Sequence, residues 1–254
     1  MTDEQLDALH RELTRKAVET CSDCGGSGLV TVIEGDEPSS RRCACRRRVD
    51  HLVRLAAAEV PREFWTVADL VLEWNRDKQE AVTAYCGNLA AAREHGLGFL
   101  MTGENGVGKT VCACTVLDAA LRQGYSAHYV TFHTLLARIR RGQRDWMLRD
   151  ALDEALRCDF LVLDELGKEG AASQDAYVVS ELDAVLRQRR HNLLPTVVVT
   201  NLEADRVGDV YGASVDSLIS DRMRVLTFRP GDFRKRGSAH ETWARLLGGD
   251  TSGE

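Results

Sequence analysis

The sequence lacks an apolar run that approaches the roughly 20 residues of a membrane-spanning helix. Its first five residues, MTDEQ, are polar and acidic, unlike the start of a secretion signal. It also lacks a surplus of positive charge, because 39 acidic residues outnumber 33 lysines and arginines and give a net charge of −6. Internal repeats and long low-complexity segments are absent as well. We therefore expect a cytoplasmic protein with no membrane partner, in which any contact with DNA depends on local basic patches.

Length and pattern predict one large α/β domain with a small appendage. The chain has 254 residues, 44% of them hydrophobic, which is enough to bury a full core. Strand patterns alternate with helical patterns, which predicts a parallel sheet flanked by helices. A helical run ends at Val60 and Pro61, so we place a domain boundary there, between residues 1–60 and 61–254. The predicted strands are 99–102, 127–132, 159–164, 195–200 and 225–228; the predicted helices include 3–20, 49–59, 76–95, 109–123, 146–157, 175–190 and one near the C-terminus.

The most informative stretch is GENGVGKT at residues 103–110, which fits the phosphate-loop pattern of glycine, four residues, glycine, lysine and serine or threonine. Its glycines allow a tight turn that presents N–H groups to phosphate oxygens, and the following helix adds its positive N-terminal end. Lys109 would supply a cation for the phosphates, and the Thr110 hydroxyl would bind Mg²⁺. The alternative is a glycine-rich helix cap, but the strand before and the helix after favour nucleotide binding. The predicted nucleotide-binding residues are Gly103, Glu104, Asn105, Gly106, Val107, Gly108, Lys109, Thr110 and Asp164.

Two predicted apolar strands end in side chains that suit phosphate hydrolysis. Strand 159–164 ends in Asp164 and Glu165, and strand 195–200 is followed by Asn201. Ligands of open α/β sheets bind at the carboxyl ends of the strands. A helix cap is the alternative for the acidic pair, and a turn residue for Asn201. We predict that Asp164 binds Mg²⁺ with Thr110, that Glu165 polarises an attacking water, and that Asn201 orients this water.

The eight cysteines divide into two groups. Four lie in apolar helix or strand patterns, where packing is the expected role: Cys86, Cys112, Cys114 and Cys158. The other four cluster in a polar, glycine-rich stretch and predict tetrahedral Zn²⁺ bound by thiolates: Cys21, Cys24, Cys43 and Cys45. One residue separates the second pair, where two are usual, and free surface cysteines are the alternative. Five arginines beside that pair would offset the negative charge of the site.

The order and spacing of four motifs resemble those of the DnaC/IstB-like AAA+ ATPases. The motifs are the loop at 103–110, LDE at 163–165, TN at 200–201 and DRMR at 221–224, and the resemblance covers about residues 60–240. It implies a five-stranded AAA+ core, ATP with Mg²⁺, and assembly of a homo-oligomeric ring or spiral. The cysteine segment is also similar to the zinc-binding region of loader-type members.

The resemblance also implies roles for two arginines. Arg222, in the DRMR motif, corresponds to an arginine finger that reaches the γ-phosphate of a neighbouring subunit. Arg234 is similar to the sensor arginine that contacts bound nucleotide, with Arg236 as the alternative. We expect the α-helical lid of larger AAA+ proteins to be missing, because little chain follows Arg234.

The function expected from this resemblance is that of an ATP-dependent helicase loader, which hydrolyses ATP and binds a replicative DNA helicase and single-stranded DNA. An IstB-like transposase-helper ATPase is the first alternative, with a transposase and duplex DNA as partners. An adaptor that binds ATP and scarcely hydrolyses it is the second. Glu165, Asn201 and Arg222 favour hydrolysis, and the cysteine segment favours the loader.

Overall fold

The structure of the protein, a computed structural model, describes residues 1–34, 37–66, 72, 75–142, 156–168 and 175–229. Most of the predicted helix 146–157 lies outside this range, as do the predicted C-terminal helix, Arg234 and Arg236. Within the described part of the chain, no helix is both long and apolar enough to cross a membrane.

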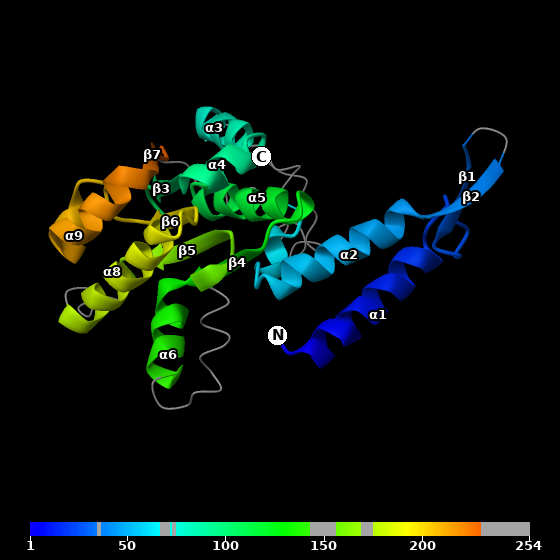
Figure 1. The fold of residues 1–254 in the computed structure, drawn as a ribbon, viewed down its shortest axis with the longest axis horizontal. Coiled ribbons are helices and arrows are strands. Elements are labelled where there is room, and N and C mark those ends of the chain that lie inside the picture. The colour runs from blue at the N-terminus through cyan, green and yellow to red at the C-terminus, as the bar shows by residue number, and fades with distance from the viewer. Residues whose placement is uncertain (35–36, 67–71, 73–74, 143–155, 169–174, 230–254) are drawn as a thin grey trace, which may run out of the picture.

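The centre of the molecule is a sheet of five parallel strands in the order β4-β5-β6-β3-β7 (Figure 1). Every residue of β3 and β6 is buried, as expected for strands covered on both faces. The predicted five-stranded parallel sheet flanked by helices is therefore confirmed. The strands are β3 (Gly98–Thr102), β4 (Ala127–Thr131), β5 (Phe160–Leu166), β6 (Thr196–Thr200) and β7 (Met223–Thr227).

Helices cover both faces of the sheet and make two separate cores. Because side chains alternate along a strand, Phe99 belongs to one core cluster and Leu100 to the other. The first face is covered by α3 (Arg76–Cys86), α4 (Leu89–His95) and α5 (Lys109–Arg122). The second face is covered by α6 (Phe132–Gly142), α8 (Ala176–His191) and α9 (Arg206–Arg222).

The N-terminal segment forms an arm that projects from this core. Its elements are α1 (Asp3–Glu19), β1 (Leu29–Glu34), β2 (Glu37–Arg42) and α2 (Ala44–Ala57). Figure 1 shows α1 and α2 side by side, with the β1-β2 hairpin at the end away from the sheet. The apolar stripe of α1 packs on α2 and is half-buried, which favours the docking of α1 on its own chain.

The far end of α2 is built into the core. Leu55 is fully buried there, and His51 Nε2 lies 2.6 Å from Asp118 Oδ1 of α5. After α2, the Ala58 carbonyl accepts a 2.8 Å hydrogen bond from Tyr129 N of the edge strand β4, before the short 3-10 turn η1 (Arg62–Phe64). The domain boundary at residue 60 remains a prediction, and α2 on its N-terminal side packs against α5.

Three helices differ from the sequence-based expectation. The helix expected at 49–59 begins at Ala44, and the helix expected at 76–95 is divided into α3 and α4 near Gly87. Helix α9 was not expected from the pattern. It contains Gly208 and Gly212, and Gly212 has a φ of 85° at a kink, so its sequence does not have the composition of a regular helix.

Candidate functional site

The predicted phosphate loop connects β3 to α5 and requires its glycines. Gly103, Gly106 and Gly108 have φ values of 137°, 79° and 96°, in the region that L side chains rarely adopt. A Cβ atom on Gly103 would lie 2.7 Å from the Phe228 carbonyl oxygen. Helix α5 begins directly at Lys109, with Gly108 as its N-cap and no side-chain cap. The first N–H groups of α5 therefore face the loop, as an anion site requires.

Lys109 and Asn201 meet at this loop. Lys109 is 6% exposed, and its Nζ donates to the carbonyl oxygens of Gly103 and Glu104, both at 2.6 Å, and to Asn201 Oδ1 at 3.0 Å. The Asn201 Nδ2 atom donates to Asn105 Oδ1 at 3.0 Å. Asn201 follows β6, so the structure brings the end of this strand against the loop.

Asp164 joins the loop to the end of β5. Its side chain is buried, and Oδ2 accepts hydrogen bonds from the Thr110 hydroxyl at 3.0 Å and from the Tyr129 hydroxyl at 2.8 Å. Its Oδ1 accepts the backbone N–H of Glu165 at 2.6 Å. A carboxylate and a hydroxyl oxygen at this separation form a donor set suited to Mg²⁺. The contact of Tyr129 with Asp164 was not apparent from the sequence, because it depends on which strands are neighbours.

Glu165 is held in an ion pair with Lys168. Its φ of 62° lies in the left-handed region, which is strained for a side chain larger than glycine. Its carboxylate is 42% exposed and pairs with Lys168 Nζ at 2.6 Å. A role as general base would require the carboxylate to leave this ion pair.

Asn75 is a second residue that sequence reasoning missed. It is 2% exposed, and its Nδ2 donates to the carbonyl oxygens of Val107 and Arg229, both at 3.3 Å. Its Oδ1 accepts the Arg229 N–H at 2.8 Å. Asn75 thus ties the phosphate loop to the chain that follows β7.

Arg222 lies at the opposite end of the sheet from the loop. Met223 pairs with Gly98 at the start of β3, four residues before Thr102, or about 13 Å at roughly 3.3 Å per residue. The guanidinium of Arg222 donates to Asp221 Oδ2 at 3.1 Å and to the His95 carbonyl at 2.9 Å. Arg222 is therefore remote from the phosphate loop of its own chain.

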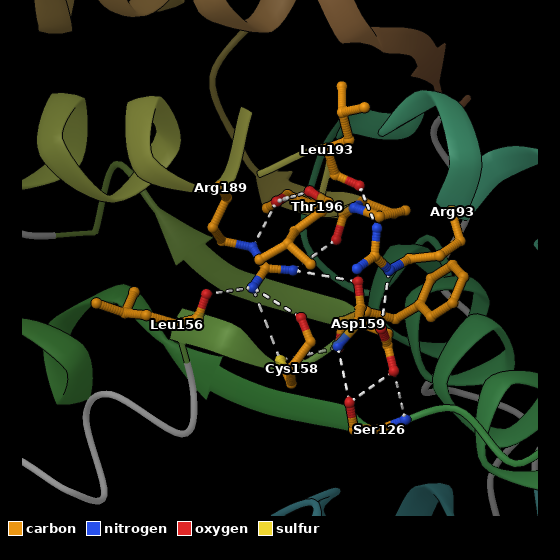
Figure 2. A network of polar contacts seen from close by, with 11 residues as sticks. Arg93, Ser126, Leu156, Cys158, Asp159, Arg189, Leu193 and Thr196 are labelled. Atoms are coloured by element: carbon orange, nitrogen blue, oxygen red, sulfur yellow. Dashed lines mark hydrogen bonds and ion pairs between the residues drawn. The ribbon is translucent and has the colours of Figure 1, made fainter. Parts of the chain in front are cut away.

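The same end of the sheet contains a buried arginine that the sequence did not reveal. Arg189 of α8 is 0% exposed, and it donates to carbonyl oxygens before β5 and β6 and to the Thr196 hydroxyl at 2.9 Å. Figure 2 shows Arg189 and Arg93 converging on this backbone, where Arg93 Nε donates to Asp159 at 2.8 Å. Asp159 also accepts from Ser126 at 2.8 Å. These contacts fix the starts of three neighbouring strands.

The four predicted zinc ligands converge at the base of the hairpin. The Sγ atoms of Cys21 and Cys43 are 3.7 Å apart, those of Cys24 and Cys45 are 3.8 Å apart, and all four lie within 4.8 Å of one another. Four thiolates at about 2.3 Å from Zn²⁺ in a tetrahedron would be separated by about 3.8 Å. The cluster therefore fits a closed zinc site.

The surroundings of the cluster act on two of its thiols in opposite directions. Burial raises the pKa of the Cys24 thiol, but hydrogen bonds from the backbone N–H groups of Gly28 and Gly26 outweigh burial and bring this pKa down to about 7. Burial and hydrogen bonds with the neighbouring thiols raise the pKa of Cys45 to about 12. Arg46 lies against Gly28, where a Cβ atom would meet its Nε at 2.2 Å. Of the remaining cysteines, Cys112, Cys114 and Cys158 are buried and Cys86 is half-buried, which agrees with packing roles.

Comparison with known proteins identifies the family. The model of the IstB-like ATP binding protein family matches residues 6–225. The chain belongs to this family. A relative named as an ATP-binding protein of insertion sequence IS5376, from Geobacillus stearothermophilus, is 27% identical over 116 residues. This IstB-like chain spans less than half of that relative, since the match covers 46% of the chain and 45% of the relative.

Solved structures share the fold of this IstB-like protein. The crystal structure of the DnaC helicase loader aligns with a TM-score of 0.60 at 20% identity, and covers 66% of this chain and all of that one. The replication initiator DnaA bound to AMPPCP and single-stranded DNA aligns with a TM-score of 0.57 at 14% identity, covering 76% of this chain and 58% of that one. The expected DnaC/IstB-like AAA+ fold is confirmed.

Proposed function

We propose that this IstB-like protein is an ATPase that loads a replicative DNA helicase onto single-stranded DNA. The observation that carries the proposal is the connection of the phosphate loop to two strand ends, through Lys109 with Asn201 and Thr110 with Asp164. These two contacts bring a phosphate cation, a donor set for Mg²⁺ and a residue able to orient water to one end of the sheet.

Each residue of this site has a task in the proposed reaction. Lys109 and the N–H groups of the loop bind the phosphates, and Thr110 and Asp164 would hold Mg²⁺, which neutralises phosphate charge when bound. Asn201 orients the attacking water, and Glu165 accepts its proton after exchanging the Lys168 ion pair for that water.

The arginine finger would act between neighbouring subunits of a homo-oligomer. Because Arg222 lies at the far end of the sheet, it reaches a phosphate loop only if that loop belongs to another copy of the chain. The role proposed for Arg222 therefore includes assembly as a ring or spiral.

The proposal includes single-stranded DNA because the structure has a basic cavity. It measures about 630 Å³, and its lining includes Arg54, Arg138, Arg141, Arg157 and the acidic Glu59. Arg138 is paired with Glu59, and Arg141 is exposed. A surplus of arginine in a cavity suits the phosphate backbone of a nucleic acid. The cavity borders the starts of β4 and β5, at the end of the sheet away from the nucleotide loop.

The helicase would bind the projecting arm, with one Zn²⁺ holding its tip. The hairpin exposes two apolar side chains on one face, Ile33 at 74% and Leu29 at 48%. Exposed apolar side chains at the end of an arm suit a protein partner. The DnaC helicase loader, which shares the fold of the core, supports the choice of a helicase.

Co-purification with the replicative helicase of the same genome or its host tests the proposal. We expect a stable complex that is lost with Ile33→Asp and kept with Leu97→Asp, which places the same charge at a 42% exposed apolar site of the core. A helicase that never binds the wild-type protein would contradict the loader function.

A transposase-helper ATPase is the second candidate, and the insertion-sequence relative favours it. It would use the same nucleotide site but bind a transposase and duplex DNA. Binding of the transposase and of duplex DNA, with no binding of the helicase, would decide for this candidate.

A further inference from the structure

Tyr129 places a hydroxyl group beside Asp164 in the interior of the protein. It lies on β4 opposite Val162 of β5, and Asp164 follows two residues later on the same face. Its hydroxyl donates the 2.8 Å hydrogen bond to Asp164 Oδ2, and the two residues are 8% and 4% exposed. A buried tyrosine thus contacts the carboxylate that is proposed to hold Mg²⁺.

Both the backbone and the ring of Tyr129 are held in place. Its backbone N–H donates to the Ala58 carbonyl at 2.8 Å, and its ring belongs to the core cluster under α5. A carboxylate oxygen is an acceptor only, so the Tyr129 hydroxyl is the donor of its hydrogen bond to Asp164.

The two side chains that donate to Asp164, Thr110 and Tyr129, would have different roles. Thr110 shares Oδ2 with Tyr129, but Thr110 is itself a proposed metal ligand. Tyr129 has no such task, so its hydroxyl can orient the carboxylate whether or not Mg²⁺ is bound. Residues that hydrogen-bond to a metal ligand set its orientation and basicity.

We propose that Tyr129 is a positioning residue that holds the Asp164 carboxylate in the orientation that binds Mg²⁺. This role rests on the proposed function, because it requires a nucleotide with Mg²⁺ at this site. Tyr129 acts through Asp164 and contacts neither the nucleotide nor the metal.

The test is the Mg²⁺ dependence of nucleotide binding, measured with a fluorescent ATP analogue in EDTA and across a range of Mg²⁺ concentrations. Tyr129→Phe keeps the ring and removes only the donor. Its binding in EDTA should match wild type, while the Mg²⁺ concentration for half-maximal enhancement should rise about 10- to 100-fold. Tyr85→Phe is the control, because it removes the 2.6 Å bond from the Tyr85 hydroxyl to the Leu97 carbonyl and should leave the Mg²⁺ titration unchanged.

Two results would contradict the role proposed for Tyr129 and leave the proposed function intact. One is a wild-type Mg²⁺ titration for Tyr129→Phe, in a protein whose unfolding curve shows that it is folded. The other is a further loss of Mg²⁺ affinity when Tyr129→Phe is added to Asp164→Asn, since a residue acting through Asp164 should then have no effect. Failure of the wild-type protein to bind nucleotide with Mg²⁺ would instead contradict the proposed function.

Discussion

The two ends of the central sheet hold their charged side chains in different ways. At the carboxyl ends of the strands, Lys109 is bound to two loop carbonyls, and Glu165 is in a half-exposed ion pair with Lys168. At the amino ends, Arg189 is completely buried and donates to backbone carbonyls that precede two strands and to Thr196. The first set of contacts can be exchanged for a ligand. Loss of the second set would leave buried carbonyl oxygens without a donor and destabilise the fold.

The difference indicates that one end of the sheet binds the ligand and the other end stabilises the fold. The loop end presents groups that a phosphate or a water could replace as partners, which a binding site requires. At the amino ends of the strands, called the braced end here, Arg189, Arg93 and Asp159 fix the strand starts. Arg222 belongs to the same end: it donates to Asp221, which also accepts a 2.7 Å hydrogen bond from Arg190. Substitutions at the two ends should therefore affect ligand binding and stability respectively.

The largest effect is expected for Lys109→Ala at the loop end. The loop would lose the cation for the phosphates, so ATP binding should fall below detection while the protein stays folded. Isothermal titration with ATP and circular dichroism measure the two quantities. Lys168→Ala, which removes a lysine from the same end of the sheet, is the control and should still bind ATP. Normal ATP affinity in Lys109→Ala would remove the basis for the site.

At the braced end, Arg189→Leu should reduce the free energy of unfolding by roughly 3 kcal/mol or more, because several buried carbonyl oxygens lose their donor. Urea unfolding measures this loss. Arg187→Leu, on the same helix but exposed and paired with Asp183, should cost much less than Arg189→Leu, because exposed ion pairs contribute little to stability. Equal losses for the two variants would show that burial of Arg189 does not brace the sheet.

Glu165→Gln should bind ATP normally and hydrolyse it at least ~100-fold more slowly, since the general base is lost. Steady-state phosphate release measures the rate, and nucleotide titration measures the binding. Wild-type turnover in this variant would exclude Glu165 as the base and leave its ion pair with Lys168 as its whole role.

The smallest effect on the sheet is expected from removal of zinc. Metal analysis should find one Zn²⁺ per chain, lost in Cys21→Ser with Cys43→Ser and kept in Cys86→Ser. Chelation should unfold the tip of the arm and leave ATP binding intact, because structural zinc stabilises its own segment. Absence of zinc would contradict the metal site, and loss of ATP binding on chelation would contradict the expectation that zinc stabilises only the arm.

Much of the loop end could be predicted from the sequence, because its residues lie within short motifs after apolar strands. Lys109, Asp164 and Asn201 are where the pattern indicated. Tyr129 and Arg189 were missed because their partners come from other elements, and neither strand order nor the burial of an arginine is visible in a linear pattern. Helix α9 was missed for a different reason, since Gly208 and Gly212 interrupt its sequence. The roles of Arg222 and Arg234 remain predictions, and Arg234 lies outside the described residues.

The most direct test of the account is whether the two ends of the sheet act in different subunits. An arginine finger supplied in trans is worth about 10³–10⁵ in rate, so Arg222→Ala should bind ATP with nearly normal affinity and hydrolyse it poorly. Mixing it with Lys109→Ala should restore part of the activity, because some junctions then combine an intact loop with an intact finger. Nearly wild-type turnover in Arg222→Ala would reduce this residue to its contacts with Asp221 and His95. An inactive variant that no mixture restores would contradict action between subunits.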